Sequence, residues 1–483
     1  MHVISAERAT NRLVVAGAFA VLLLFAGLIP LGPWLDEFYL LNDLHSRGFS
    51  ATIYRIFNFS PRPLSELLLY FYCLAIDFFK SPLVIPFVSL FWIALVTVPL
   101  LPTWRSRPAR LAVAAMLALL LLGHEVAEVF YWPAGVAAYL PTIIAALAIL
   151  ALDWGARIER RNGKLWIAIA LVVSATSSEV GAMFAAVYAS MAILIFRQRG
   201  IKAILSFALP LLVALAVIYL ALRGRATTTR EIFGDASVGH NPAGAFRALG
   251  DYLFAQLAAS GDGLAALQST VFSLFSKVLF FFGVYLALSA KPKAQSIDGD
   301  AQAMRLALAA SLLITSVLTL VASLYQFGVV CCERHDTVRQ VYIIIAIGSI
   351  ASYLAIRKPA ATTRLASLAL LASILIPLSV AIPKLWHDYR SYPAYIASGG
   401  IIWESVHSAG SNVTIPQVMP GQIFGGTAKI ARMKAGYFPP GNYRHTAKQD
   451  ELIDQILFFY GKESATLIAP AFDGPDRPSV SRP

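Results

Sequence analysis

The chain has 483 residues, of which 58% are hydrophobic and 14% are charged, and its mean hydropathy is +0.67. A soluble domain carries about 25% charged residues, so this composition excludes an ordinary water-soluble globular protein and indicates a protein of the lipid bilayer. The formal net charge of +12 is therefore no sign of nucleic-acid binding, and we predict no nucleic-acid partner.

Apolar runs long enough to cross a bilayer recur along most of the chain, and short clusters of arginine and lysine separate many of them. Such clusters are expected on the cytoplasmic side. We predict an all-α polytopic membrane protein with about eleven spans, a cytoplasmic N-terminus and an extracytoplasmic C-terminus. The predicted spans are residues 13–31, 82–102, 110–123, 136–152, 165–178, 180–196, 203–222, 265–288, 306–325, 340–356 and 365–382.

The acidic pair Asp36–Glu37 stands where the first predicted span ends and a long external loop, residues 32–81, begins. A carboxylate at the edge of a low-dielectric region has a raised proton affinity unless a cation compensates it. Such a group suits a general base that takes a proton from a hydroxyl, so both residues are candidate catalytic groups. The alternative is an interfacial pair that caps the next helix or simply meets water.

Two prolines flank Arg62 in the same loop and fix the backbone around it. An arginine held at an interface in this way can bind a phosphate through two parallel hydrogen bonds, and Arg55 is a weaker candidate of the same type. Anchoring to lipid headgroups is the alternative role for Arg62. The next segment, residues 64–79, is apolar but short and carries two carboxylates, so we predict a helix at the outer interface.

The second external loop, residues 124–135, contains His124, Glu125 and Glu128. His124 and Glu128 are four residues apart and are expected to share a helix face, where they would contact substrate or bind a metal. Ordinary loop polarity is the alternative.

Further candidate substrate-binding residues stand at two more external positions. Glu179 lies between two predicted spans, and an ionisable residue at membrane depth is a functional hypothesis by default. Arg334 and Arg339 belong to a charged segment that we predict to be a fourth external loop, residues 326–339. They would stabilise a phosphate leaving group, unless they only form ion pairs within a solvated loop.

The last hundred residues differ in character from the rest. From Pro383 onward the apolar runs shorten, while glycine, proline and polar residues increase. Residues 413–418, 427–433 and 464–469 are predicted strands, and 449–460 is a predicted amphipathic helix. We therefore divide the chain into a transmembrane module, residues 1–382, and a small extracytoplasmic α/β domain, residues 383–483.

The order of these features resembles the GT-C class of membrane glycosyltransferases, in the bacterial type that uses polyprenyl-phosphate sugars. The features that carry the resemblance are one span, the pair Asp36–Glu37, and the stretch Pro61-Arg62-Pro63-Leu64 before an interfacial helix; the architecture matches over residues 1–382. In the second loop many relatives place a single Asp where this chain has His124, Glu125 and Glu128, which leaves the second acidic partner open.

The resemblance implies an inverting transferase in the bacterial inner membrane. The donor would be a sugar on a polyprenyl phosphate, and the acceptor a hydroxyl of a glycan, lipid or protein. Asp36 would be the base, Glu37 its neighbour or a ligand of a divalent cation, and Arg62 would face the lipid phosphate. No other cofactor is implied.

Other classes of membrane protein remain open. The predicted cytoplasmic loops are too short for a nucleotide-binding domain and no GxxxxGK[ST] motif is present, which argues against an ATP-driven transporter on this chain. A flippase or small-molecule transporter would place charges near the bilayer midplane, whereas these spans are poor in charge. A ligase or polymerase of lipid-linked glycans would share the predicted topology.

Reporter fusions would test the predicted topology. A reporter after Arg161 or Lys293 should be cytoplasmic and one at Pro483 extracytoplasmic, because loops with clusters of arginine and lysine alternate along the chain with loops that lack them. A cytoplasmic reporter at Pro483 would contradict the span count and the side assigned to the acidic pair.

Overall fold

The structure is a computed structural model that describes most of the chain. The described residues are 2–31, 37–79, 83–124, 126–155, 163–196, 201–233, 243–247, 249–250, 264–289, 299–327, 333–355, 363–416, 441–444 and 452–468. Asp36 and Glu125 lie outside them, as does the predicted strand 427–433. Glu37 begins a helix, but its side chain is not among the described ones.

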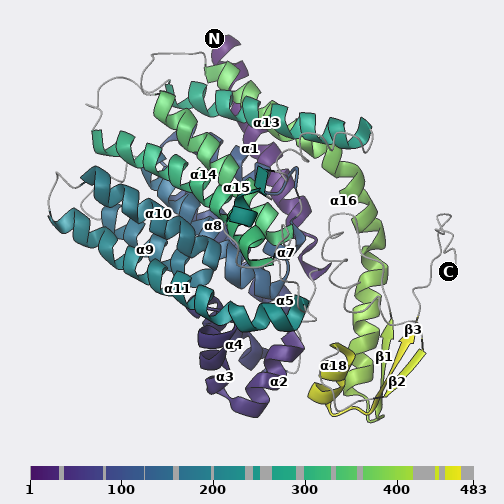
Figure 1. Ribbon diagram of the computed structural model, residues 1–483. Helices are drawn as coiled ribbons and strands as arrows, with labels where there is room; N and C mark the ends of the chain where they lie inside the picture. The colour runs from purple at the N-terminus through teal and green to yellow at the C-terminus, as the bar shows by residue number, and fades with distance from the viewer. Residues whose placement is uncertain are drawn as a thin grey trace.

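Long apolar helices form the body of the protein (Figure 1). Eight described helices are long and apolar enough to cross a bilayer, and each coincides with a predicted span. They belong to α1 (His2–Ala26), α5 (Val84–Thr103), α8 (Pro133–Trp154), α11 (Ile201–Phe233), α13 (Leu264–Ser289), α14 (Gly299–Phe327), α15 (Glu333–Ala355) and α16 (Thr363–His407).

The remaining three predicted spans coincide with shorter helices. These are α6 (Arg107–Leu119), α9 (Gly163–Ser177) and α10 (Glu179–Phe196). A helix rises about 1.5 Å per residue, so helices of this length fall short of the roughly 30 Å hydrocarbon core or only just reach across it. The prediction of a polytopic helical membrane protein is confirmed, whereas the count of eleven crossings stays a prediction.

Helix α8 occupies the centre of the bundle, packed between α5, α9, α15 and α4. Most of its side chains are buried, and many are small, including Ala137, Ala138, Ala145 and Ala146. In a membrane protein small residues let neighbouring backbones approach closely, and van der Waals packing then stabilises the contact. The side chains of α8 are therefore packed against neighbouring helices on every side.

The same close packing explains a glycine at the start of α10. A Cβ added to Gly181 would overlap the carbonyl oxygen of Ser174 and would lie 2.6 Å from Thr142 Oγ1. Gly17 in α1 provides a contrast, because an added Cβ there would make an ordinary 3.7 Å contact with Leu371.

Short helices gather at the end of the bundle opposite the N-terminus (Figure 1). Three of them follow α1 and the short η1 (Ile29–Leu31): α2 (Glu37–Arg47), α3 (Phe49–Asn58) and α4 (Pro63–Phe79). The turn α7 (Ala127–Phe130) contacts α8 and α15. Helix α4 coincides with residues 64–79, the segment predicted to be a helix at the outer interface.

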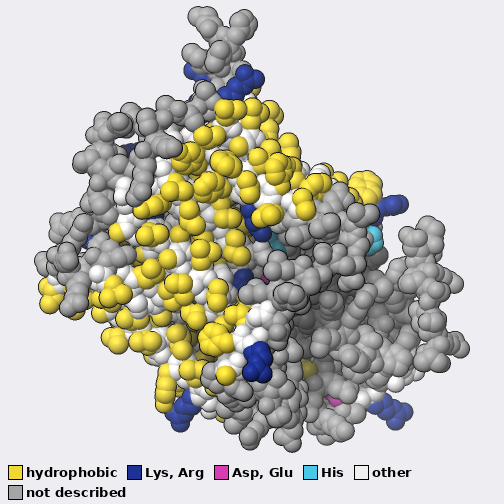
Figure 2. Space-filling view, turned by 45° about the horizontal axis from the view of Figure 1, so that its top comes forward, with side chains coloured by type: hydrophobic (Ala, Val, Ile, Leu, Met, Phe, Trp, Pro, Cys, Tyr) yellow, Lys and Arg dark blue, Asp and Glu magenta, His cyan; other side chains and the backbone are white. Residues whose placement is uncertain are grey.

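The other end of the bundle has its own ion pair. Arg305 near the start of α14 donates through Nε to Asp153 Oδ2 near the end of α8, at 2.6 Å. Gly155, which comes directly after α8, packs against the carbonyl of Pro102 near the end of α5. Between the two ends, Figure 2 shows a continuous hydrophobic surface over the helices, with most of the visible lysine and arginine at its margins.

The C-terminal residues form a small sheet beside one helix. The strand order is β1-β3-β2, with β1 (Asn412–Pro416) parallel and β2 (Gly441–Arg444) antiparallel to β3 (Ser464–Ile468). Strands β1 and β3 and helix α18 (Leu452–Tyr460) coincide with predicted elements, while β2 was not predicted. The predicted boundary at residue 383 falls inside α16, which continues to His407, and a separate α/β domain stays a prediction.

One predicted loop boundary is wrong. The fourth external loop was expected to reach residue 339, but α15 begins at Glu333 and places both Arg334 and Arg339 on helix. The positive end of the helix dipole stabilises carboxylates in the first turns, such as that of Asp336, and this interaction helps the helix to begin at Glu333. The third external loop was expected from residue 223, where the apolar part of α11 that could cross a membrane ends, although the helix itself continues to Phe233.

We expect Gly181→Ala to destabilise the protein by roughly 1–3 kcal/mol, because the added methyl group has to displace a backbone carbonyl in a packed core. Thermal unfolding in detergent would measure the change. Gly17→Ala is the matched control and should be neutral or slightly stabilising, since alanine is the better helix former. Equal unfolding temperatures for the two variants would contradict the packing described for α10.

Candidate functional site

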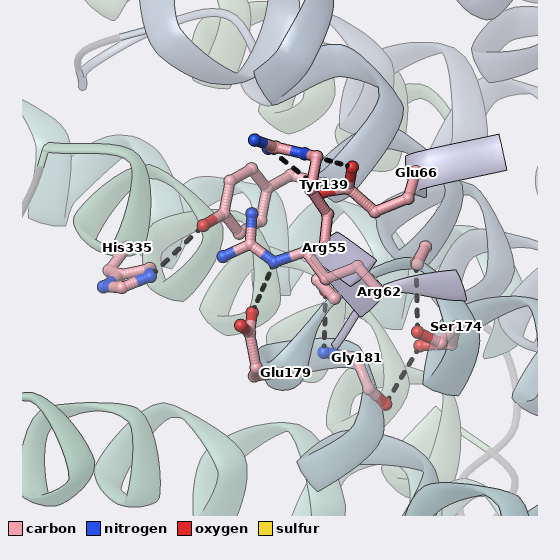
Figure 3. A network of polar contacts seen from close by, with 10 residues as sticks. Arg55, Arg62, Glu66, Tyr139, Ser174, Glu179, Gly181 and His335 are labelled. Atoms are coloured by element: carbon pink, nitrogen blue, oxygen red, sulfur yellow. Dashed lines mark hydrogen bonds and ion pairs between the residues drawn. The ribbon is translucent and has the colours of Figure 1, made fainter. Parts of the chain in front are cut away.

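A partly buried ion pair joins the first loop to the middle of the chain (Figure 3). Arg62 donates through Nε to Glu179 Oε2 at 2.7 Å, and each side chain is only 15% exposed. The Arg62 guanidinium also lies over the ring of Tyr139 in α8, 5.5 Å from its centroid. Glu179 is the first residue of α10, where the helix dipole favours a negative charge.

The surroundings keep Arg62 charged. Burial works against the charged guanidinium, but the carboxylate of Glu179 outweighs it and raises the pKa of Arg62 above its ordinary value. The Nε atom is used by Glu179, and no hydrogen bond joins the two terminal nitrogens to any residue that the structure describes. These nitrogens can therefore donate to an anionic ligand.

A second pair of contacts extends this cluster to α15. The hydroxyl of Tyr139 lies 3.3 Å from His335 Nε2, and the two rings meet edge to face (Figure 3). One residue earlier, the guanidinium of Arg334 lies 5.7 Å from the ring centroid of Trp132. The first turn of α15 thus brings a histidine and an arginine to the Tyr139 side of the site.

Arg55 has a different environment from Arg62. Its Nε donates to Glu66 Oε2 at 2.8 Å and its Nη2 to Glu66 Oε1 at 3.5 Å, and it stacks on Phe59 at 4.9 Å. Glu66 is only 4% exposed. The pair lines a shallow depression between α2, α3 and α4. Both edges of the carboxylate are engaged, so this arginine serves to join α3 to α4.

Arg339 lies one helical turn beyond His335 on α15. Its Nη2 donates to Asp336 Oδ1, three residues earlier. The side chain is largely buried, and its Nε has no hydrogen-bond partner among the described residues. Nearby on the same helix, Gln340 accepts a hydrogen bond of 2.8 Å from Lys277 of α13. Cationic groups therefore continue along this side of α15.

The prediction that His124 and Glu128 share a helix face is wrong. Gly123 has a φ of +88°, His124 lies in the turn after it, and α7 begins only at Ala127. Burial of the His124 ring, together with the positive charge of Lys277, lowers its pKa to about 4, so the imidazole is neutral at pH 7. Glu128 is buried on α7.

No group of three or more metal-binding side chains occurs among the described residues. Asp36, Glu37 and Glu125 have no described side chains, and the divalent cation therefore stays a prediction.

A network of hydroxyl groups lies beside the first turn of α10, which begins at Glu179, and the sequence patterns did not predict it. Thr142 hydrogen-bonds to Ser174 and lies 3.2 Å from the hydroxyl of Tyr342, while Ser174 donates to the carbonyl of Gly181 at 3.2 Å. The amide of Gly181 donates to Ser178 Oγ at 3.0 Å. The only signal in the sequence was the pair Ser177-Ser178 beside Glu179. Single hydroxyl residues in apolar spans gave no signal, because they usually hydrogen-bond to the backbone of their own helix.

The structure thus unites two of the predicted site residues, Arg62 and Glu179, and adds Tyr139 and His335. Arg55 lies beside them but is paired with Glu66, whose backbone amide donates to the Arg62 carbonyl at 2.9 Å (Figure 3). No protein-family model, no curated protein and no solved structure matches the chain. The class defined by the fold is a polytopic helical membrane protein, and its activity has to be argued from the site.

Proposed function

We propose that the chain is a glycosyltransferase of the GT-C type that moves a sugar from a polyprenyl phosphate to an acceptor hydroxyl, with inversion. The membrane would be a bacterial inner membrane, with the site on the face opposite the N-terminus. The acceptor would belong to a glycan, a lipid or a protein.

One observation carries this proposal: Arg62 has terminal nitrogens with no hydrogen bond to a described residue, while Glu179 and Tyr139 hold it in place. A lipid phosphate is an anion at the membrane surface, and a fixed planar guanidinium binds it better than a mobile ammonium. Helix α2, which starts at Glu37, lies at the same end of the bundle, and the proposed base Asp36 directly precedes it in the sequence (Figure 1).

The chemistry requires a base and a cation. Asp36 would take the proton from the acceptor hydroxyl as its oxygen attacks the anomeric carbon of the donor sugar. The bond between that carbon and the phosphate oxygen would break, and the phosphate would leave with the bonding electron pair. Arg62, together with Arg334 and Arg339 of α15, would stabilise the negative charge that develops on the leaving phosphate.

The positions of the described charges favour an enzyme over a transporter. Transport sites usually lie near the bilayer midplane, at broken helices. Here the pair Arg62–Glu179 involves the start of α10, and the pair Arg305–Asp153 lies at the opposite end of α8. Between these two ion pairs, hydroxyl groups such as Thr142 and Ser174 make the polar contacts.

Asp36→Asn tests the proposed base. We expect transfer to fall by about 10²–10⁴, because an amide cannot accept the hydroxyl proton. Glu37→Gln should be milder unless a cation is bound. Transfer would be measured with purified protein and a polyprenyl-phosphate sugar, and an unchanged melting temperature would show that the variant still folds. Wild-type rates for Asp36→Asn would remove the central claim.

Arg62→Lys tests the phosphate contact, with Arg55→Lys as the matched control. Lysine keeps the charge but lacks the fork that holds Glu179 and the phosphate together, so donor binding should weaken about tenfold or more. Arg55→Lys should alter stability and leave donor binding close to wild type, because the guanidinium of Arg55 is hydrogen-bonded twice to Glu66.

Arg334→Lys and Arg339→Lys extend this comparison to α15. If all three variants, including Arg62→Lys, bound donor like the wild type, the phosphate would be held elsewhere. Equal loss in Arg55→Lys and Arg62→Lys would point to a general structural defect and not to a phosphate site.

A further inference from the structure

Helix α18, near the C-terminal end of the chain, packs against α2, the helix that begins at Glu37. The Asn42 side-chain amide donates to the backbone carbonyl of Gln455 at 3.0 Å and to Gln455 Oε1 at 2.6 Å. Asn42 is 6% exposed and Gln455 is 5% exposed. Buried side-chain hydrogen bonds between elements 413 residues apart fix both position and register.

Aromatic packing surrounds this polar contact. Phe38 lies 5.6 Å from Phe459 and 5.7 Å from Tyr460 between ring centroids, and His45 stacks on Phe459 at 5.2 Å. Phe38 and Ile456 are buried in one hydrophobic cluster with residues of α4 and α8. The first two turns of α2 are therefore covered by α18.

The opposite face of α18 is attached to α16. Ile453 and Leu457 share a second hydrophobic cluster with Val406 of α16 and with β1 and β3. Lys462, just before β3, donates to the carbonyls of Ser408 and Gly410 at 2.5 and 2.7 Å, at the end of α16. Cations favour the negative end of a helix dipole. Helix α18 thus connects a helix of the membrane bundle to α2.

We infer that α18 is a positioning element for α2: it sets where this helix begins, at Glu37, directly after the proposed base Asp36 in the sequence. The inference rests on the proposed function for its catalytic meaning, but the contact itself needs no substrate. Because Asp36 precedes α2 directly in the sequence, we expect a shift of α2 to displace the proposed base, whereas Arg62 is held by Glu179 and Tyr139.

Two variants break the contact without changing side-chain volume greatly. Asn42→Leu removes the donor of both hydrogen bonds. Gln455→Met removes only the side-chain acceptor on α18. Phe458→Ala is the control, because Phe458 lies on the same helix but is 42% exposed. If Asn42→Leu fails to fold, Gln455→Met alone still decides the question.

The first readout is amide hydrogen exchange of residues 37–47 in lipid nanodiscs. Gln455→Met should increase exchange there by about fivefold, as expected for one lost buried hydrogen bond, Asn42→Leu by at least as much because it loses two, and Phe458→Ala should not. The double variant should be no worse than the more severe single variant, because the two residues share one contact. Unchanged exchange in both single variants would overturn the inference, whatever their activity.

The second readout separates positioning from general damage. With a polyprenyl-phosphate sugar, both variants should lower kcat by roughly ten- to a hundredfold and leave KM for the donor near wild type, because a displaced base slows the chemistry without touching the phosphate site. A raised KM with an unchanged kcat would overturn the positioning role. If the wild-type protein itself showed no transfer, the proposed function would fail, and hydrogen exchange would still decide whether α18 holds α2.

Discussion

The ion pair between Arg62 and Glu179 is the interaction on which the proposed site depends. It joins residues 117 positions apart, and through Tyr139 and His335 it extends to α8 and α15. A charge removed from water requires its partner, and loss of one member of a buried pair typically costs about 3–5 kcal/mol because the other charge is left uncompensated. The pair therefore fixes the first loop against the bundle. It also holds a guanidinium ready for an anion, whereas the guanidinium of Arg55 is engaged by Glu66.

The membrane explains why polar chemistry concentrates at the ends of the helices. In hydrocarbon an unpaired polar group is expensive, so the described interior uses hydroxyl groups that satisfy one another, such as Thr142, Ser174 and Tyr342. Ion pairs lie near helix ends, where water can reach one side. This arrangement gives the protein two chemically different faces. The face with α2–α4 combines cations, aromatic rings and carboxylate partners.

Sequence patterns predicted the helices far better than the contacts between them. Length and hydropathy were enough to locate every long helix, because the bilayer dictates both. The partnership of Arg62 with Glu179 is a tertiary contact that no local pattern encodes, although each residue was singled out by its surroundings. Tyr139 and His335 were missed since an aromatic residue in a span and a histidine in a charged segment both have commoner explanations. The start of α15 was misjudged because charge was taken as a sign of loop, whereas helix dipoles accept acidic residues in first turns. At α7 the error was the opposite, because the spacing of His124 and Glu128 was taken as a sign of helix although α7 begins only at Ala127.

Helix α16 has a consequence of its own, because it is one helix from Thr363 to His407, although it contains Pro377, Pro383 and Pro393, and it ends beside the sheet. The number of residues in a helix sets both the distance and the direction of the segment that follows it, since each residue adds about 1.5 Å and rotates that segment by about 100°. Inserting one residue between the membrane part and Val406 would swing the sheet to another side of the bundle. Seven residues would nearly restore its direction but lift it by about 10 Å. The length and the helical phase of α16 together thus set the position of the C-terminal strands relative to the bundle. Evolutionary insertions into α16 should therefore add close to whole helical turns.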